Sequence, residues 1–147
     1  MKQDIVARML DFISTNRLCV ISTICYDGTP HSSVMHYSVT HNPLTLYFST
    51  DDRSTKIDNI KSSPSTSVVI GWSEIDWITV QLRGKSRVIT VSSEVATAKR
   101  VHYAIHPNSQ KFENDPHTVF IEFTPQYGRF SDLGVLPEII AEFTGGL

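Results

Sequence analysis

The sequence of 147 residues has little cysteine and no long apolar run. Its two cysteines, Cys19 and Cys25, belong to one predicted strand, where about 3.3 Å per residue would place their Cα atoms roughly 20 Å apart. A disulfide requires about 5.5 Å, so we expect two reduced thiols and a cytoplasmic protein. No segment approaches the roughly 20 apolar residues of a membrane-spanning helix, and residues 1–10 lack the apolar core of a signal peptide.

The chain also lacks an excess of charge of one sign. Its net charge is −2, from 13 Lys and Arg against 15 Asp and Glu. Such a balance gives no broad basic field to attract phosphates. We therefore expect neither nucleic acid nor a membrane surface as a partner.

Several motifs of enzymes and metal sites are missing as well. There is no G-x-S-x-G segment for a serine hydrolase, and neither the G-x-x-x-x-G-K-[ST] loop nor the G-x-G-x-x-G turn that binds nucleotide phosphates. His102 and His106 stand four residues apart on a predicted helix, which places two imidazoles on one face, but a third ligand is available only if His117 approaches them. We therefore predict no metal site.

What the chain does contain is a series of clear strand patterns with a few helical patterns between them. Apolar residues at helical spacing predict helices at 2–16, 54–63 and 93–106. Runs rich in β-branched residues predict strands at 18–26, 30–39, 44–49, 66–72, 77–90, 118–125 and 127–132. Asp27-Gly28 predicts a hairpin turn, and Gly84 predicts a bulge or bend in its strand. Hairpin-linked strands of this kind predict a small antiparallel barrel in a single domain, 1–147, because closure hides the strand edges.

The segment FSTDDRSTK, Phe48–Lys56, joins a predicted strand to a predicted helix start. A helix N-terminus presents free N–H groups and the positive end of the helix dipole, which suits an anion. The segment adds hydroxyls and positive charges from Ser49, Thr50, Arg53, Ser54, Thr55 and Lys56. The alternative is a polar turn in which Ser54 caps the helix through its own side chain. Asp51 and Asp52 would repel a phosphate about 8 Å away by roughly 0.5–2 kcal/mol each, so only several well-directed donors would hold it.

Two tryptophans, Trp72 and Trp77, flank the short polar link SEID. Ordinary packing in the core or at its rim explains such residues. A wall against a planar ring is the less common alternative. The residues alone leave both interpretations open.

Three segments in this order resemble the pyridoxamine 5'-phosphate oxidase-like family of FMN-binding split β-barrels: DGTPHSSVMHY, LYFSTDDRSTKIDNIKSSPSTSVVIGW and VQLRGKSRV. The similarity covers about residues 10–132. It includes the D-G-x-P turn before a flavin-lining strand, the hydroxyl pair that ends a strand, and the spacing from Lys56 to Pro64 to Trp72. The resemblance implies a mainly β (α+β) fold, a six-stranded antiparallel split β-barrel with about three flanking helices.

The resemblance also implies the residues that bind FMN. The hydroxyls and Lys56 of the segment 49–56 would surround the phosphate, with Arg53 replacing an arginine of the family. The backbone of residues 33–38 would lie along the isoalloxazine and the ribityl chain. Because family members are typically homodimers with two flavins at the interface, the ring-side residues would come from a second subunit. The implied flavin-binding residues are Ser33, Val34, Met35, His36, Ser49, Thr50, Arg53, Ser54, Thr55, Lys56, Trp72, Thr79 and Gln81.

The implied chemistry is that of a flavin-dependent oxidoreductase. The flavin would take a hydride at N5 from a small-molecule substrate or a nicotinamide donor, and no side chain is marked as catalytic. The oxidases carry arginine at the position of Ser33 and S-R-K where this chain has Ser54-Thr55-Lys56, and their substrate-binding C-terminal segment has no counterpart here. These departures argue against pyridoxamine phosphate oxidation. The alternatives are a flavin-binding module without turnover and a split barrel that binds haem or a deazaflavin.

Overall fold

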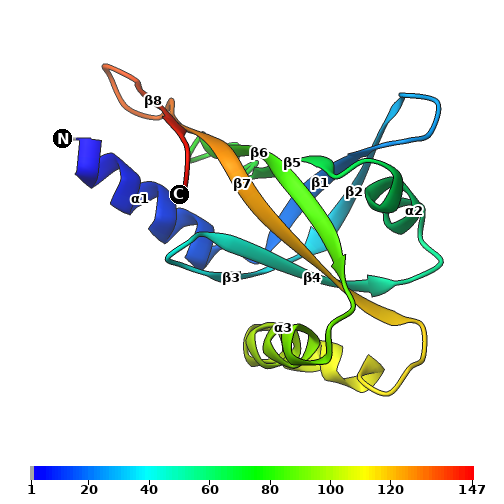
Figure 1. Ribbon diagram of the computed structural model, residues 1–147. Coiled ribbons are helices and arrows are strands. Elements are labelled where there is room, and N and C mark those ends of the chain that lie inside the picture. Colours follow the sequence, from blue (N-terminus) through cyan, green and yellow to red (C-terminus); the bar gives the residue numbers. More distant parts are fainter. Residues whose placement is uncertain (1) are drawn as a thin grey trace.

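The computed structural model describes residues 2–147, in which one antiparallel sheet curls into a partly open barrel with helices around it (Figure 1). The strands are β1 (Leu18–Ile24), β2 (Pro30–His36), β3 (Ser38–Thr40), β4 (Thr45–Asp51), β5 (Ser65–Ile70), β6 (Ile78–Ile89), β7 (Thr118–Asp132) and β8 (Ile139–Thr144). The helices are α1 (Lys2–Thr15), α2 (Thr55–Ser62), α3 (Ser92–Ile105) and the 3-10 helix η1 (Pro107–Phe112). The strand order is β2-β1-β5-β6-β7-β4-β3, and β8 pairs with β7. The predicted mainly β, antiparallel barrel with flanking helices is confirmed.

The strand count differs from the predicted six, because the described residues form eight strands. The predicted strand 30–39 breaks at Tyr37, whose N–H donates to the Arg17 carbonyl (3.0 Å) and whose hydroxyl donates to the Ile13 carbonyl (2.5 Å). There the chain leaves β1, and it continues as β3 beside β4. The C-terminal residues add β8, and the two predicted closing strands form one continuous strand, β7. The predicted bulge at Gly84 is confirmed, because the register of β6 shifts between Arg83 and Gly84.

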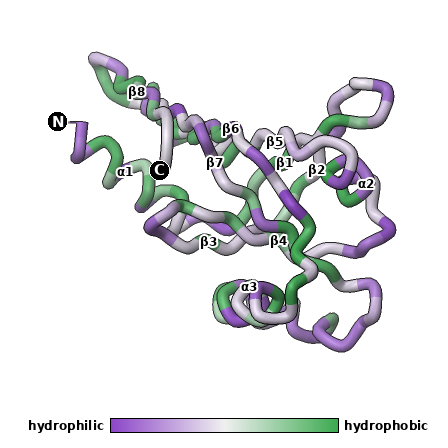
Figure 2. The backbone as a smooth tube through the Cα atoms, viewed as in Figure 1, coloured by the Kyte–Doolittle hydropathy of each residue, from purple (hydrophilic) through white to green (hydrophobic). Residues whose placement is uncertain are grey.

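The inner face of the sheet forms the main apolar core. Alternate residues of the strands point inward, as Leu46 and Phe48 do on β4 and Ile121 and Phe123 do on β7. A smaller cluster packs α3 against the opposite face of β4 and β7, through Tyr47, Ala98 and Phe120 among others. Both connections nearest the end of β4, from β4 to α2 and from α3 to β7, are mostly hydrophilic (Figure 2). Among residues 2–147, no helix has the length and apolar character needed to cross a membrane.

Candidate functional site

The barrel is open between two of its strands. Within residues 2–147, β2 pairs only with β1, so one edge of β2 binds no other strand, and this edge approaches β4 without pairing with it (Figure 1). Along β4, β3 pairs only with Thr45–Tyr47, which leaves residues 48–51 without a strand on that side. We call this opening the seam and define it by residues 33–36 of β2 and 49–56 at the β4–α2 junction. Its backbone N–H and C=O groups can hydrogen-bond to a ligand.

Two serine hydroxyls of the seam are buried without a hydrogen-bond partner among the described residues, those of Ser33 and Ser54. Ser33 lies on the inner face of β2 opposite the buried Ile21, and Ser54 directly precedes α2. Ser54 occupies the N-cap position of α2 without a side-chain cap bond, so the alternative interpretation of this segment, a turn capped by the Ser54 side chain, is wrong. A buried hydroxyl that lacks a partner costs about 1–3 kcal/mol. Both hydroxyls therefore have an unused hydrogen-bond donor.

Lys56, in the first turn of α2, is the free positive charge of the seam. Its side chain is half-buried and makes no hydrogen bond or ion pair with the part of the chain that the structure describes. Burial lowers the pKa of the Lys56 ammonium, while the nearby Asp51 carboxylate acts in the opposite direction. A partly desolvated ammonium without a counter-ion beside a helix N-terminus is suited to an anion.

Arg53 binds Asp51 rather than pointing freely into the seam. Its Nε donates to Asp51 Oδ1 (2.9 Å), its Nη2 donates to Oδ2 (2.7 Å), and its backbone N–H also donates to Oδ1 (2.8 Å). These bonds lower the pKa of the Asp51 carboxyl and raise the pKa of the Arg53 guanidinium. In this conformation the guanidinium neutralises Asp51 and is not available to replace a phosphate-binding arginine.

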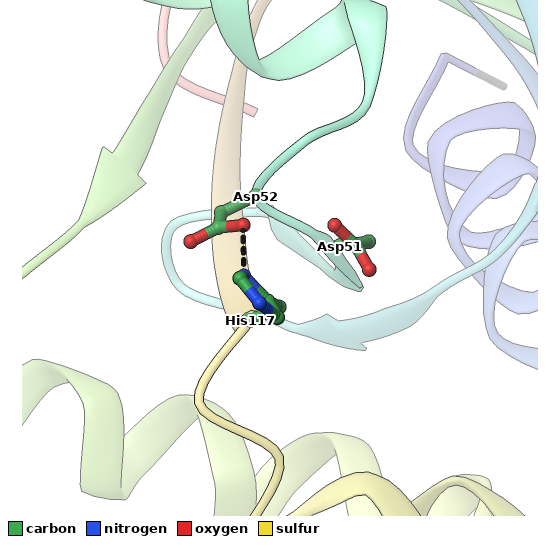
Figure 3. Close-up of side chains that lie close together, drawn as sticks. All are labelled: Asp51, Asp52 and His117. Carbon is green, nitrogen blue, oxygen red and sulfur yellow. Dashed lines mark hydrogen bonds and ion pairs between the residues drawn. The ribbon is translucent and has the colours of Figure 1, made fainter.

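Asp52 has a partner of its own, His117. Its Oδ1 lies 2.9 Å from His117 Nδ1, and Figure 3 shows this contact with the Asp51 carboxylate set apart from it. Among the described residues, these three side chains form the one group of acids and histidines whose possible ligand atoms lie within 4.8 Å of one another. The group does not support a metal site, because Arg53 binds both Asp51 oxygens. The sequence suggests that both acids repel a phosphate, whereas in the structure each has a side-chain partner, Arg53 for Asp51 and His117 for Asp52.

Asn59 fixes the position of the Ser54–Lys56 segment, although sequence analysis gave it no such role. It is buried on α2, and its Nδ2 donates to Thr23 Oγ1 (3.0 Å) and to Cys25 Sγ (3.6 Å). These bonds hold α2 against β1. A polar residue between the two apolar positions of this helix, Ile57 and Ile60, was the only available signal.

The other predicted residues of the seam differ in their surroundings. Val34 is 64% exposed on the outer face of β2, Met35 packs partly buried against the core, and Thr55 is exposed. Ser49 and Thr50 border a cavity of about 250 Å³ whose other lining residues are Asp51, Ser109, Phe112, Asp115 and Thr118. His36 lies at the end of β2 against the ring of His106.

The ring-side residues predicted from the resemblance lie away from the seam of their own chain. Helix α2 precedes β5 and Trp72 follows it. The six residues of β5, roughly 20 Å of strand, therefore separate Trp72 from α2. Its half-exposed indole borders a cavity of about 590 Å³ together with Arg17 and Asp76. Thr79 and Gln81 lie on the outer face of β6, where Gln81 borders a groove of about 340 Å³. One chain alone does not bring these residues to the phosphate segment.

Comparison with known proteins identifies the family. Residues 5–132 match the family model described as pyridoxamine 5'-phosphate oxidase. The chain belongs to the pyridoxamine 5'-phosphate oxidase-like family. A curated relative in this family is General stress protein 26 of Bacillus subtilis, which is 22% identical over 135 residues, 90% of this chain and 92% of the relative.

Solved structures share the split-barrel fold of this pyridoxamine 5'-phosphate oxidase-like chain. General Stress Protein 26 of Bacillus anthracis is 23% identical with a TM-score of 0.68, and the match covers 93% of this chain and 97% of that one. A haem-binding protein from Mycobacterium smegmatis is 17% identical with a TM-score of 0.76. The match covers 91% of this chain but 55% of that longer protein, so the chain spans about half of its length. At these identities the likeness demonstrates the fold.

Proposed function

We propose that the protein binds FMN in the seam, with the phosphate held at the start of α2. The observation that carries this proposal is the set of unsatisfied donors there: the buried hydroxyls of Ser33 and Ser54 and the half-buried Lys56 ammonium. A dianionic phosphate would satisfy the Lys56 charge, the Ser54 hydroxyl and the free N–H groups of the first turn together. The Ser33 hydroxyl would donate from the opposite side of the seam.

Bound FMN would supply hydride transfer, and the protein would act as an FMN-dependent oxidoreductase. The free edge of β2 would orient the planar ring through its backbone groups, and the apolar core beneath Met35 would exclude water. We assign no catalytic side chain. The substrate-binding C-terminal segment of the oxidases has no counterpart here, so we propose that the electron donor is a nicotinamide or a small molecule other than pyridoxamine phosphate.

Turnover is tested separately from binding. Anaerobic addition of NADH or NADPH to the FMN-loaded protein is expected to bleach the flavin absorbance, and air is expected to restore it. A loaded protein that stays oxidised with both donors would identify a flavin-binding module without this activity. Binding and turnover thus fail in distinguishable ways.

We further propose a homodimer that unites the two groups of flavin-binding residues. Val34 of β2, Val20 of β1 and Val69 of β5 lie side by side in register on the outer face of the sheet. Val34 is 64% exposed, and Gln81 follows Val69 in the next strand of this row. Packing this face on a second copy would bury the valines and bring Trp72, Thr79 and Gln81 toward the partner's seam.

Val34→Glu is expected to convert this dimer into a monomer and to weaken FMN binding at least about tenfold, because a charge would have to be buried at the interface. Light scattering measures the mass, and titration with FMN measures the affinity. Ala96→Glu, at an exposed position of α3, is the control and should change neither. A Val34→Glu protein that stays dimeric would contradict the proposed interface.

Asp51→Asn is expected to strengthen FMN binding by about three- to tenfold, since it would release Arg53 toward the phosphate and remove one negative charge. Asp52→Asn is the matched control, because it removes one charge but leaves the Asp51–Arg53 pair intact. It should have a smaller effect, and riboflavin affinity should not change in either variant. Equal gains in the two variants would show that Arg53 does not reach the ligand.

Haem is a second candidate ligand. One structure with this fold is described as a haem-binding protein, and the exposed imidazole of His36 at the end of the seam is a possible iron ligand. In this alternative the haem propionates, rather than a phosphate, would accept from the serine hydroxyls and Lys56. The visible absorbance spectrum distinguishes the two ligands.

A further inference from the structure

Three imidazoles stack between α3 and the end of β2. The ring centroids of His36 and His106 lie 5.0 Å apart, and those of His106 and His102 lie 4.8 Å apart. His102 is 1% exposed, His106 is half-buried and His36 is exposed. The predicted helical face shared by His102 and His106 is therefore real, but the third histidine beside it is His36 rather than His117.

These contacts hold three consecutive residues of the chain. His36 packs against the His106 ring, the Tyr37 carbonyl lies 2.6 Å from His106 Nε2, and Ser38 Oγ lies 3.0 Å from His102 Nδ1. Because a carbonyl oxygen only accepts, His106 Nε2 carries the proton in the hydrogen bond to Tyr37. Residues 36–38 are where the chain leaves the seam-lining strand β2 and crosses to β3. His102 of α3 and His106, which directly follows this helix, thus contact the point where that strand ends.

The surroundings of the stack favour neutral imidazoles. Burial, together with His106 and His36, lowers the pKa of His102 to about 4, while the backbone of Tyr47 on β4 acts in the opposite direction. Burial also lowers the pKa of His106, and His36 and Arg17 add to this effect. The hydrogen bond to the Tyr37 carbonyl acts in the opposite direction.

The remaining groups that face the stack offer no compensating negative charge. Phe120 of β7 presents an aromatic ring to His102 at 6.0 Å, and Tyr103 of α3 does so at 6.2 Å. Glu113, beyond η1, acts on the Tyr103 hydroxyl rather than on an imidazole. A proton added to the stack would therefore meet other imidazoles and Arg17 without a carboxylate to balance it.

We propose that His102 and His106 form an acid-sensitive clamp that positions residues 36–38 and thereby the end of the ligand seam. Protonation of the buried imidazole places an uncompensated charge between α3 and β3, which loosens α3 and releases the strand end. The clamp rests on the proposed FMN site for its ligand, while its titration is a property of the protein without flavin.

The direction of the pH effect follows from the lowered pKa. An unfolded histidine titrates near pH 6.5, so between about pH 6.5 and pH 4 the unfolded state binds more protons at position 102 than the folded state does. The stabilisation is complete above this window and is lost as the pH falls through it. The melting temperature of the flavin-free protein should therefore fall from about pH 7 to about pH 5.

The test compares the wild-type protein with a variant that cannot titrate here, His102→Asn combined with His106→Gln. Riboflavin is the ligand, since it has no phosphate whose own protonation would change the affinity. Because folded His102 has a pKa of about 4, we expect wild-type affinity to fall by about tenfold between about pH 5 and pH 3. The double variant should change by less than about twofold, and His41→Asn, outside the stack, should behave as wild type. An equal pH dependence in wild type and double variant would overturn the clamp.

A second measurement needs neither flavin nor a foldable variant. In NMR spectra of the flavin-free wild type, the amide shifts of residues 33–38 should follow the imidazole shifts of His102 and His106 during an acid titration. Amide shifts that stay constant while these imidazoles titrate would overturn the positioning role. Absence of both FMN and riboflavin binding at about pH 7 would instead reject the proposed function and leave this second result to decide the clamp.

Discussion

Replacing Lys56 by glutamine is expected to weaken FMN binding by about 10- to 100-fold and to leave riboflavin binding within about twofold. The reason is the state of the ammonium in the structure: half-buried, beside the first turn of α2 and without a counter-ion among residues 2–147. A charge-assisted hydrogen bond in such a site contributes about 1.5–3 kcal/mol. Only FMN carries the phosphate that would accept it. Titration of the flavin-free protein with each ligand, followed by fluorescence or calorimetry, measures both affinities.

Lys61→Gln supplies the matched control, since Lys61 lies on the exposed surface of the same helix. It removes the same charge from α2 and should change FMN affinity by less than about twofold, because solvent and salt screen exposed charges. Equal losses of FMN and riboflavin in Lys56→Gln would show that Lys56 supports the fold of the seam and does not hold the phosphate. Equal losses of FMN affinity in both lysine variants would show that the net charge of α2, rather than a contact of Lys56 with the phosphate, determines the affinity.

The serine variants are expected to change stability and binding in opposite directions. Ser54→Ala and Ser33→Ala each remove a buried hydroxyl that lacks a partner among the described residues, so the flavin-free protein should become more stable by about 1 kcal/mol. The same changes should weaken FMN binding by about five- to fiftyfold, since each removes a donor to the ligand. Thermal unfolding of the flavin-free variants and FMN titration provide the two measurements.

Tyr103→Phe distinguishes the site from a general effect of unsatisfied hydroxyls. The Tyr103 hydroxyl is also buried without a partner in the described chain, but it belongs to the cluster between α3 and the sheet. Its removal should stabilise the protein similarly without altering FMN affinity. If Ser54→Ala destabilises the flavin-free protein and binds FMN normally, the hydroxyl serves the fold and the assignment to the ligand is wrong.

The sequence predicted the family and the barrel because both depend on local patterns in a fixed order. A hairpin turn at Asp27-Gly28, a strand that ends in Ser49-Thr50 and a helix that starts at Ser54 are each visible within about ten residues. The same local signals placed the β4–α2 junction correctly. They did not reveal β8, which pairs with β7 only after the sheet has formed.

The surroundings of the site could not be predicted, because they depend on residues far apart in the chain. Ser38 and His102 are separated by 64 positions, and Asp52 and His117 by 65. No periodicity links such pairs. The Asp51–Arg53 pair is local, yet its two hydrogen bonds depend on the side-chain conformation rather than on the residue types. Both acids therefore looked repulsive in the sequence, whereas in the structure Arg53 neutralises Asp51 and His117 contacts Asp52.

The visible absorbance spectrum of the purified protein, with identification of the extracted chromophore, tests the central claim most directly. The spectrum is expected to be that of an oxidised flavin after loading with FMN, and extraction should return one FMN per chain. A haem spectrum in the purified protein would contradict FMN binding in the seam. Failure of the flavin-free protein to retain added FMN would contradict it as well.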